Sequence, residues 1–281
     1  MSELQDLLAV LELEPTDTGF RASSFDEGHG VVFGGQLLAQ SIVAGAATAP
    51  DKEVKSIHIV FARSASAAAP LELDVEVLHG GRAFASASVS IRQGDRLCTR
   101  ATVLLHAPDP DLIRHAEPMP AVDGPATLAA RTPDSWWDIR VVGDVDISDP
   151  DAVGPADLDV WTRFAGAPAA LTTSQALLGY ASDGFLIGTA MRPHAGVGQA
   201  QAHVSISTTV LSHTLTFHEP FEAADWMLLA HHSRYAGRGR AYGGADVFTE
   251  QGAMVASYVQ ESMVRDFPEG AAPAAGERSK H

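Results

Sequence analysis

One pattern of apolar and polar positions occurs twice along the chain. The tetrapeptide GRAF at 81–84 returns as GRAY at 239–242, and Gln-Gly at 93–94 returns at 251–252 with the same offset. Between these markers the side chains alternate in both copies, and each alternating segment runs through a glycine turn into a second one. A period of two is typical of half-buried β-strands. The sequence therefore predicts a duplicated unit built around a long antiparallel hairpin.

Each half begins with a helical pattern and continues with strands. The segments that begin QLLA at 36–39 and QALL at 175–178 both carry apolar residues at helical spacing. Residues 55–61, 71–77 and 207–217 have the character of strands, and 71–77 alternates apolar with acidic residues, as an antiparallel sheet with one wet face requires. One helix followed by strands, twice over, predicts an α+β fold. A hotdog domain has this arrangement, so we expect a double hotdog with two antiparallel sheets, each wrapped around a central helix.

The expected domain boundaries follow from where the periodic pattern stops. We expect an N-terminal hotdog domain at 1–110, a linker at 111–155, a C-terminal hotdog domain at 156–268 and a disordered tail at 269–281. The linker is rich in Pro, Asp and Ala and has no sustained period. It contains the pair Trp136-Trp137, and because such aromatic side chains usually bury, we expect this pair to pack at the seam between the halves.

Composition argues against several kinds of partner. The chain has 281 residues, a formal net charge of −16 and a single cysteine, Cys98. The charge disfavours nucleic acid and anionic lipid, and one cysteine excludes an intramolecular disulfide and a cysteine-based zinc cage. No stretch reaches the roughly 18 apolar residues of a membrane span, and the N-terminus lacks the basic start of a signal peptide. We expect a cytoplasmic protein with no nucleic-acid partner and no membrane span.

Several motifs occur in order across both halves and resemble the acyl-CoA thioesterase II family: VFGGQ at 32–36, LGYASD at 178–183, His213 with FHEPF at 217–221, and VASYVQE at 255–261. The resemblance implies a double-hotdog enzyme that hydrolyses acyl-CoA to free fatty acid and CoA. An Asp, a Ser or Thr, and a Gln would hold the nucleophilic water. The matching positions are Asp183 and Gln260. Such a mechanism requires no metal and no redox cofactor. Double-hotdog chains often associate further, so we expect a homo-oligomer that acts in fatty acid metabolism.

The position of Asp183 agrees with this role. It ends a predicted helix in an apolar stretch, where desolvation raises the pKa of a carboxyl group toward what a water-activating base needs. The structural alternatives are a carboxylate that merely ends the helix and, for Gln260, an amide that bridges two strands.

The hydroxyl is where the chain departs from the family. The resemblance places the family's Ser or Thr at Val210, whose side chain cannot hydrogen bond to water. On a regular strand, Thr208 and Ser212 share the face of position 210, while Thr209 faces the other way unless a bulge intervenes. Thr208 and Ser212 are therefore the candidate replacements. The main alternative function is a catalytically weakened protein that binds acyl-CoA without hydrolysing it.

Five residues are candidates for substrate binding. Gly34 and Gly35 allow the close backbone approach that an oxyanion site at a helix N-terminus needs, although which half supplies the donor stays open. His58 lies on a predicted strand, where a structural histidine is the alternative. Arg82 and Arg240 are candidate cations for the anionic CoA, with solvated surface arginines as the alternative.

Other chemistries fit the sequence less well. His231 and His232 are adjacent, so on a strand they point to opposite faces and do not easily share a metal ion. The chain lacks the Gly-x-Ser-x-Gly elbow of a serine hydrolase. Asp26 and His29 have a spacing loosely similar to that of hotdog hydratases, which leaves an enoyl-CoA hydratase-like enzyme as the more distant alternative.

Overall fold

The structure is a computed structural model that describes residues 3–25, 28, 30–133 and 135–267. Its described residues form one sheet with the strand order β1-β2-β4-β5-β6-β3-β9-β12-β11-β10-β8-β7. Every neighbouring pair is antiparallel. The strands of the first half are β1 (Glu14–Pro15), β2 (Gly19–Ala22), β3 (Glu53–Phe61), β4 (Leu71–Gly80), β5 (Phe84–Gln93) and β6 (Arg96–His106). Those of the second half are β7 (Asp138–Val141), β8 (Asp157–Arg163), β9 (Ile206–Phe217), β10 (Met227–Gly237), β11 (Arg240–Thr249) and β12 (Met254–Asp266).

The two halves meet where β3 pairs with β9. The register runs from Ser56 opposite Thr216 to Val60 opposite Ser212. Each half would otherwise leave the edge of this strand open to pairing with another chain. The expected two sheets are therefore joined into one, with four strands in the same relative order on each side of the junction.

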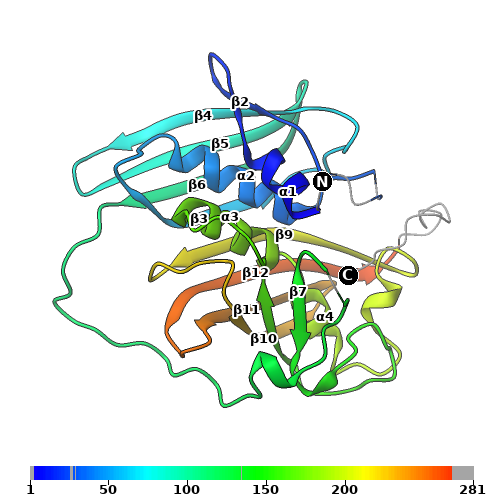
Figure 1. The fold of residues 1–281 in the computed structure, drawn as a ribbon. Coiled ribbons are helices and arrows are strands. Elements are labelled where there is room, and N and C mark those ends of the chain that lie inside the picture. Colours follow the sequence, from blue (N-terminus) through cyan, green and yellow to red (C-terminus); the bar gives the residue numbers. More distant parts are fainter. Residues whose placement is uncertain (1–2, 26–27, 29, 134, 268–281) are drawn as a thin grey trace.

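Two long helices pack against each other and against the sheet. They are α2 (Gly34–Ala46) and α3 (Leu171–Ser182), and Figure 1 shows them between the strands of the first half, above, and those of the second half, below. The shorter helices are α1 (Glu3–Leu11) and α4 (Leu186–Met191), with 3-10 turns η1 (Pro125–Thr127), η2 (Val142–Asp144) and η3 (Gln199–Gln201). As expected, four strands follow the long helix in each half, but two further strands precede it, β1 and β2 before α2 and β7 and β8 before α3.

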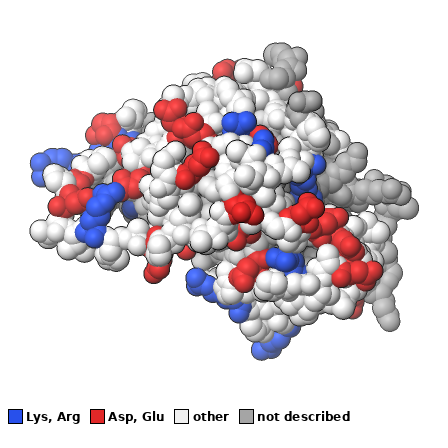
Figure 2. All heavy atoms as spheres, turned by 60° about the horizontal axis from the view of Figure 1, so that its bottom comes forward, with Lys and Arg blue, Asp and Glu red and all other residues white. Residues whose placement is uncertain are grey.

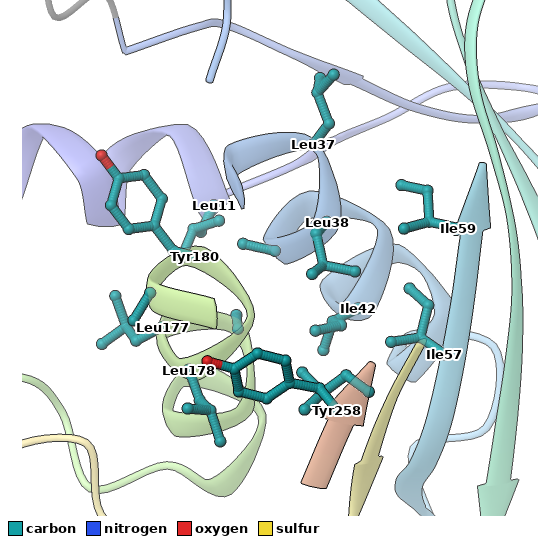
Figure 3. Close-up of a cluster of buried hydrophobic side chains, with 14 of the residues drawn as sticks. Leu11, Leu37, Leu38, Ile42, Ile57, Ile59, Leu177, Leu178, Tyr180 and Tyr258 are labelled. Atoms are coloured by element: carbon teal, nitrogen blue, oxygen red, sulfur yellow. The ribbon is translucent and has the colours of Figure 1, made fainter. Parts of the chain in front are cut away.

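The main core fills the space between the helices and the sheet. Leu38 and Ile42 of α2 are fully buried, and so are Leu177 and Leu178 of α3. Figure 3 shows these side chains together, with Ile57 and Ile59 of β3 facing α2. Both helices are buried around most of their circumference because each contacts the other as well as the sheet. Burial on all sides explains why their apolar pattern is broader than a single stripe.

The repeated tetrapeptide marks equivalent hairpin turns. Arg82 lies between β4 and β5, and Arg238 and Gly239 connect β10 to β11. Arg238 and Gly239 both have positive φ, 57° and 72°, as a two-residue hairpin turn of this hand requires. The predicted long antiparallel hairpin is confirmed in both halves, because β5 pairs with β6 after Gln93-Gly94 and β11 pairs with β12 after Gln251-Gly252.

The stretch between the halves has structure of its own. Strand β7 lies within the expected linker and pairs with β8 at the edge of the sheet. Trp137 is 7% exposed and stacks on Phe164 with ring centroids 5.7 Å apart, while Trp136 meets Phe25 of the first half edge-on at 6.0 Å. Both indoles also contact Tyr180 of α3. The expectation that this pair packs at the seam is confirmed, whereas the expected disordered tail at 269–281 lies outside the described residues.

The surface reflects the excess of acidic over basic residues in the sequence. Figure 2 shows Asp and Glu spread over one face, with Lys and Arg interspersed rather than gathered in one patch. Among the described helices, none is long and apolar enough to cross a membrane.

Candidate active site

The end of α3 carries the acid that the sequence singled out. Asp183 is the C-cap residue of α3 and is 8% exposed. The chain turns sharply after it, because Phe185 has φ 61° and ψ −41° and directly begins α4. Such a backbone conformation is strained for a residue with a side chain. This turn holds Asp183 at the junction of the two long helices.

The start of α2 meets this carboxylate from the other half. The backbone N–H of Gly35 donates a hydrogen bond to Asp183. A Cβ atom on Gly34 would stand 2.5 Å from Asp183 Oδ2, and one on Gly35 would stand 2.4 Å from the backbone oxygen of Tyr180. Both positions therefore require glycine for close approach. The first half thus brings helix N–H groups, which carry partial positive charge, to an acid of the second half.

Burial changes the acidity of Asp183. Desolvation raises the pKa of Asp183 to about 7, against the opposing effect of hydrogen bonds from Gln260 and from the N–H of Gly35. A carboxyl group with a pKa near 7 exchanges protons readily at neutral pH. The expected rise in basicity at the end of this helix is confirmed.

Gln260 joins Asp183 to a buried hydrogen-bond network. The side chain of Gln260 is 2% exposed, and its Nε2 lies 3.3 Å from Asp183 Oδ1 and 3.5 Å from His213 Nδ1. Its Oε1 accepts a hydrogen bond of 3.2 Å from the hydroxyl of Ser262. The backbone oxygen of Asp183 also lies 3.5 Å from this Nε2, so the amide nitrogen faces three acceptors, while the amide oxygen faces a donor.

Three buried aromatic side chains continue from Gln260 into the core. Ser182 Oγ donates to the carbonyl of Gly179 at 2.9 Å and lies 3.1 Å from His213 Nε2, so this nitrogen carries the proton and Nδ1 accepts from Gln260. His213 stacks on Tyr258, whose hydroxyl lies 2.7 Å from His231 Nε2. Burial lowers the pKa of His213 to about 3 and that of His231 to about 4. Both histidines are consequently neutral near pH 7.

A β-bulge in β9 changes the direction of the Ser212 side chain, one of the two predicted replacement hydroxyls. Opposite β12, Ser212 pairs with Glu261 and Val210 pairs with Ser262, which leaves Leu211 as an extra residue in β9. The extra residue turns Ser212 to the outer face with Glu261. The expectation that Ser212 shares the face of Val210 is therefore wrong. Thr208 does share that face and is buried, and its hydroxyl lies 3.4 Å from His203 Nε2.

A cavity of about 670 Å³ opens beside Asp183 between the halves. Its wall contains Gly34, Asp183, Thr208 and Val210, together with the apolar side chains Phe25, Val31, Val32, Phe33, Leu37, Phe61, Phe185, Ile187 and Leu211. The described wall also holds the polar side chains of Arg63, Ser64, Gln199, His203 and Thr209, and Asp183 is its only acid. A largely apolar wall with a few polar groups is typical of a ligand-binding site.

Three predicted substrate-binding residues lie away from this cavity. His58 is exposed on the outer face of the sheet, where its Nδ1 lies 2.8 Å from the hydroxyl of Thr214. Arg82 and Arg240 are exposed at hairpin turns and are absent from the cavity wall. A strand face or a turn directs each of these three side chains to solvent, so none of them lines the cavity, and their roles in binding stay predictions. Asp26 and His29, the basis of the hydratase alternative, lie outside the described residues.

Sequence reasoning missed two residues at the site. Ser262 lies two positions after Gln260 on the same strand face, a relation that simple alternation could have indicated. Arg63 follows β3 and lines the cavity, and it is the only Lys or Arg among the described residues of the cavity wall. No sequence pattern marked Arg63, since its position depends on how the halves meet.

Comparison with known proteins agrees with this fold and site. Family models match for the acyl-CoA thioesterase N-terminal domain over residues 21–106 and for the C-terminal domain over residues 113–264. The second match includes most of the stretch 111–155 expected as a linker. Acyl-CoA thioesterase 2 of Haemophilus influenzae is 29% identical, and the alignment covers 93% of this chain and 98% of that protein.

Solved structures give the same result. Acyl-CoA thioesterase II TesB2 from Mycobacterium marinum is 28% identical, with a TM-score of 0.80 over 95% of this chain and all of that one. A protein of hot dog fold from Alicyclobacillus acidocaldarius, 15% identical, has a TM-score of 0.76 over 94% of this chain and 99% of that one, which shows similarity of fold alone. Fold and family matches together define a thioester hydrolase with a hotdog fold. The chain belongs to the acyl-CoA thioesterase II family.

Proposed function

We propose that this enzyme hydrolyses acyl-CoA to a free fatty acid and CoA at the cavity beside Asp183. The observation that carries the proposal is the buried carboxylate of Asp183, with a pKa of about 7, set between Gln260 and the glycine N-terminus of α2. Acyl-CoA fits the cavity by chemistry, since its acyl chain is apolar and its thioester carbonyl needs one hydrogen-bond donor. The double-hotdog arrangement, with α2 and α3 as the two central helices, belongs to the same proposal.

In the proposed reaction, Asp183 accepts a proton from water as the water oxygen bonds to the thioester carbon. Negative charge collects on the former carbonyl oxygen, and the N–H groups at the start of α2, including that of Gly34, stabilise it. Gln260 holds the water beside Asp183. The carbon–sulfur bond then breaks, and the proton on Asp183 passes to the CoA sulfur. No covalent intermediate with the enzyme is formed.

The phosphates of CoA would lie at the mouth of the cavity. Arg63 is exposed there and sits on the loop after β3. Its guanidinium group suits phosphate because it presents several donors in a planar fork. We assign CoA recognition to Arg63 in place of Arg82 and Arg240.

Hydrolysis of octanoyl-CoA and palmitoyl-CoA by wild type and Asp183→Asn tests the function. Asparagine keeps the shape but cannot accept the proton, so kcat should fall by about 100-fold or more for both substrates. Asp246→Asn is the matched control, since burial also raises the pKa of Asp246 but this residue is absent from the cavity wall. Equal activity of Asp183→Asn and wild type would contradict the mechanism. Tight acyl-CoA binding by calorimetry without wild-type hydrolysis would instead favour the non-hydrolysing alternative.

A further inference from the structure

Ser262 is a buried hydroxyl that the mechanism above leaves without a role. It is 2% exposed, and it lies on the inner face of β12, two residues beyond Gln260. Its Oγ donates to Gln260 Oε1 at 3.2 Å. Directly opposite on β9 stands Val210, which lines the cavity and has no hydrogen-bonding group.

The carboxamide of Gln260 needs an anchor at its oxygen. The terminal torsion of a glutamine side chain has a broad energy profile, so packing alone does not fix the plane of the amide. Its nitrogen faces three acceptors: Asp183 Oδ1 at 3.3 Å, and the backbone oxygen of Asp183 and His213 Nδ1 at 3.5 Å each. These bonds hold the nitrogen weakly, since 2.7–3.2 Å is the usual range for an N–H donor. Among the described residues, the hydroxyl of Ser262 is the hydrogen-bond partner of the amide oxygen, at 3.2 Å.

We propose that Ser262 positions Gln260 for catalysis and so replaces the hydroxyl that Val210 lacks. The proposal rests on the proposed function, because it assigns Gln260 to the water. Ser262 reaches Gln260 along the same strand, whereas a Ser or Thr at position 210 would reach it from the neighbouring strand. Side chains directly opposite each other in an antiparallel pair have Cβ atoms about 4.5–5.5 Å apart, so a hydroxyl at position 210 would lie beside the one at position 262.

Removing this hydroxyl should affect turnover more than binding. In Ser262→Ala the buried Oε1 of Gln260 loses its donor, and the amide rotates away from the direction that holds water beside Asp183. Small errors in the position of a reacting group cost up to about 100-fold in rate. We expect kcat for octanoyl-CoA to fall by about 10- to 100-fold while KM changes by less than about threefold.

The decisive variant restores a hydroxyl from the other strand. Val210→Thr replaces one methyl group with a hydroxyl at almost constant shape, so the double variant Val210→Thr/Ser262→Ala should recover at least about a third of the wild-type kcat. The single Val210→Thr variant serves as the reference for the double. Ser262→Cys, with a weaker donor of similar size, should give an intermediate kcat. Thermal unfolding of each variant identifies any that fail to fold, in which case Ser262→Cys and the double variant provide the comparison.

The outcomes separate this proposal from the proposed function. Wild-type kcat in Ser262→Ala, or a folded double variant no faster than Ser262→Ala, would overturn the role of Ser262 as a positioning residue. Asp183→Asn is measured in the same series. If Asp183→Asn is inactive while Ser262→Ala is fully active, only the role of Ser262 fails. If Asp183→Asn is fully active, the role of Asp183 as base fails, and if wild type does not hydrolyse octanoyl-CoA, the proposed function itself fails.

Discussion

The two long helices occupy equivalent positions in the two halves but differ at the ends where they meet. Helix α3 ends at the buried Asp183, whereas the equivalent C-cap of α2 is Ala47. Helix α2 begins with Gly34 and Gly35, whereas α3 begins with Leu171 after Ala170. The acid therefore comes from one half and the close-packed helix N-terminus from the other. Each half has its own helix N-terminus and C-terminus. Among the described residues, an acid at a helix C-terminus meets a glycine N-terminus at one place, where the end of α3 contacts the start of α2.

The adjacent glycines of α2 give the sharpest test of this division. Gly34→Ala would place a Cβ 2.5 Å from the tip of the Asp183 side chain, so the carboxylate must move, and kcat should fall by about 100-fold. Gly35→Ala would collide with backbone at 2.4 Å, so it should lower the free energy of unfolding by about 1–3 kcal/mol. Enzyme kinetics and thermal unfolding separate the two effects.

Gly124→Ala is the control for both glycine variants, because no atom lies within 4 Å of a Cβ built there. It should leave kcat and the unfolding temperature at their wild-type values. If Gly34→Ala kept full activity in a folded protein, the N-terminus of α2 would not control Asp183, and the first half would contribute only to the fold.

The pH dependence of activity should come from the second half alone. Asp183 acts in its ionised form, and its pKa is about 7, so kcat/KM should rise about tenfold per pH unit below 7 and level off above it. His213 and His231 have pKa values of about 3 and 4 and are neutral throughout this range. A pH–rate profile of octanoyl-CoA hydrolysis measures this limb. A profile that is flat from pH 5 to 8 would contradict the role of Asp183 as base.

The raised pKa of Asp183 also predicts that this residue lowers the free energy of unfolding at neutral and higher pH. The folded-state pKa of Asp183 lies above the value of 3.8 that is usual for an aspartate, so between about pH 4 and 7 the folded protein binds the proton that the unfolded chain has lost. Stability therefore falls as pH rises through this interval. Asp183→Asn removes the penalty and should be more stable than wild type at pH 8, by up to about 4 kcal/mol, with little difference at pH 4. Denaturant unfolding at the two pH values tests this, and no gain at pH 8 would contradict it.

Local sequence predicted the parts of the site that depend on single elements. The family motifs pointed to Asp183 and Gln260, and the periodicity of the neighbouring residues placed them at a helix end and on a strand. Ser212 could not be assigned correctly because the bulge at Leu211 arises from pairing with β12, which strand alternation does not contain. The joining of two expected sheets into one likewise depends on the pairing of β3 with β9.

Arg63 offers the smallest and most specific test, because it asks what the first half contributes beyond the helix N-terminus. Arg63→Gln should raise KM for acyl-CoA by about threefold to fivefold, the scale of one solvent-exposed charge pair, and the effect should fade at high salt. Thioesters of pantetheine, which lack the phosphates, should show no change in KM. Arg82→Gln and Arg240→Gln remove equally exposed charges at the hairpin turns and are the matched controls. An increase in KM for these two variants but not for Arg63→Gln would move CoA recognition from the cavity mouth to the turns, and both halves would then bind CoA through the repeat that first revealed the duplication.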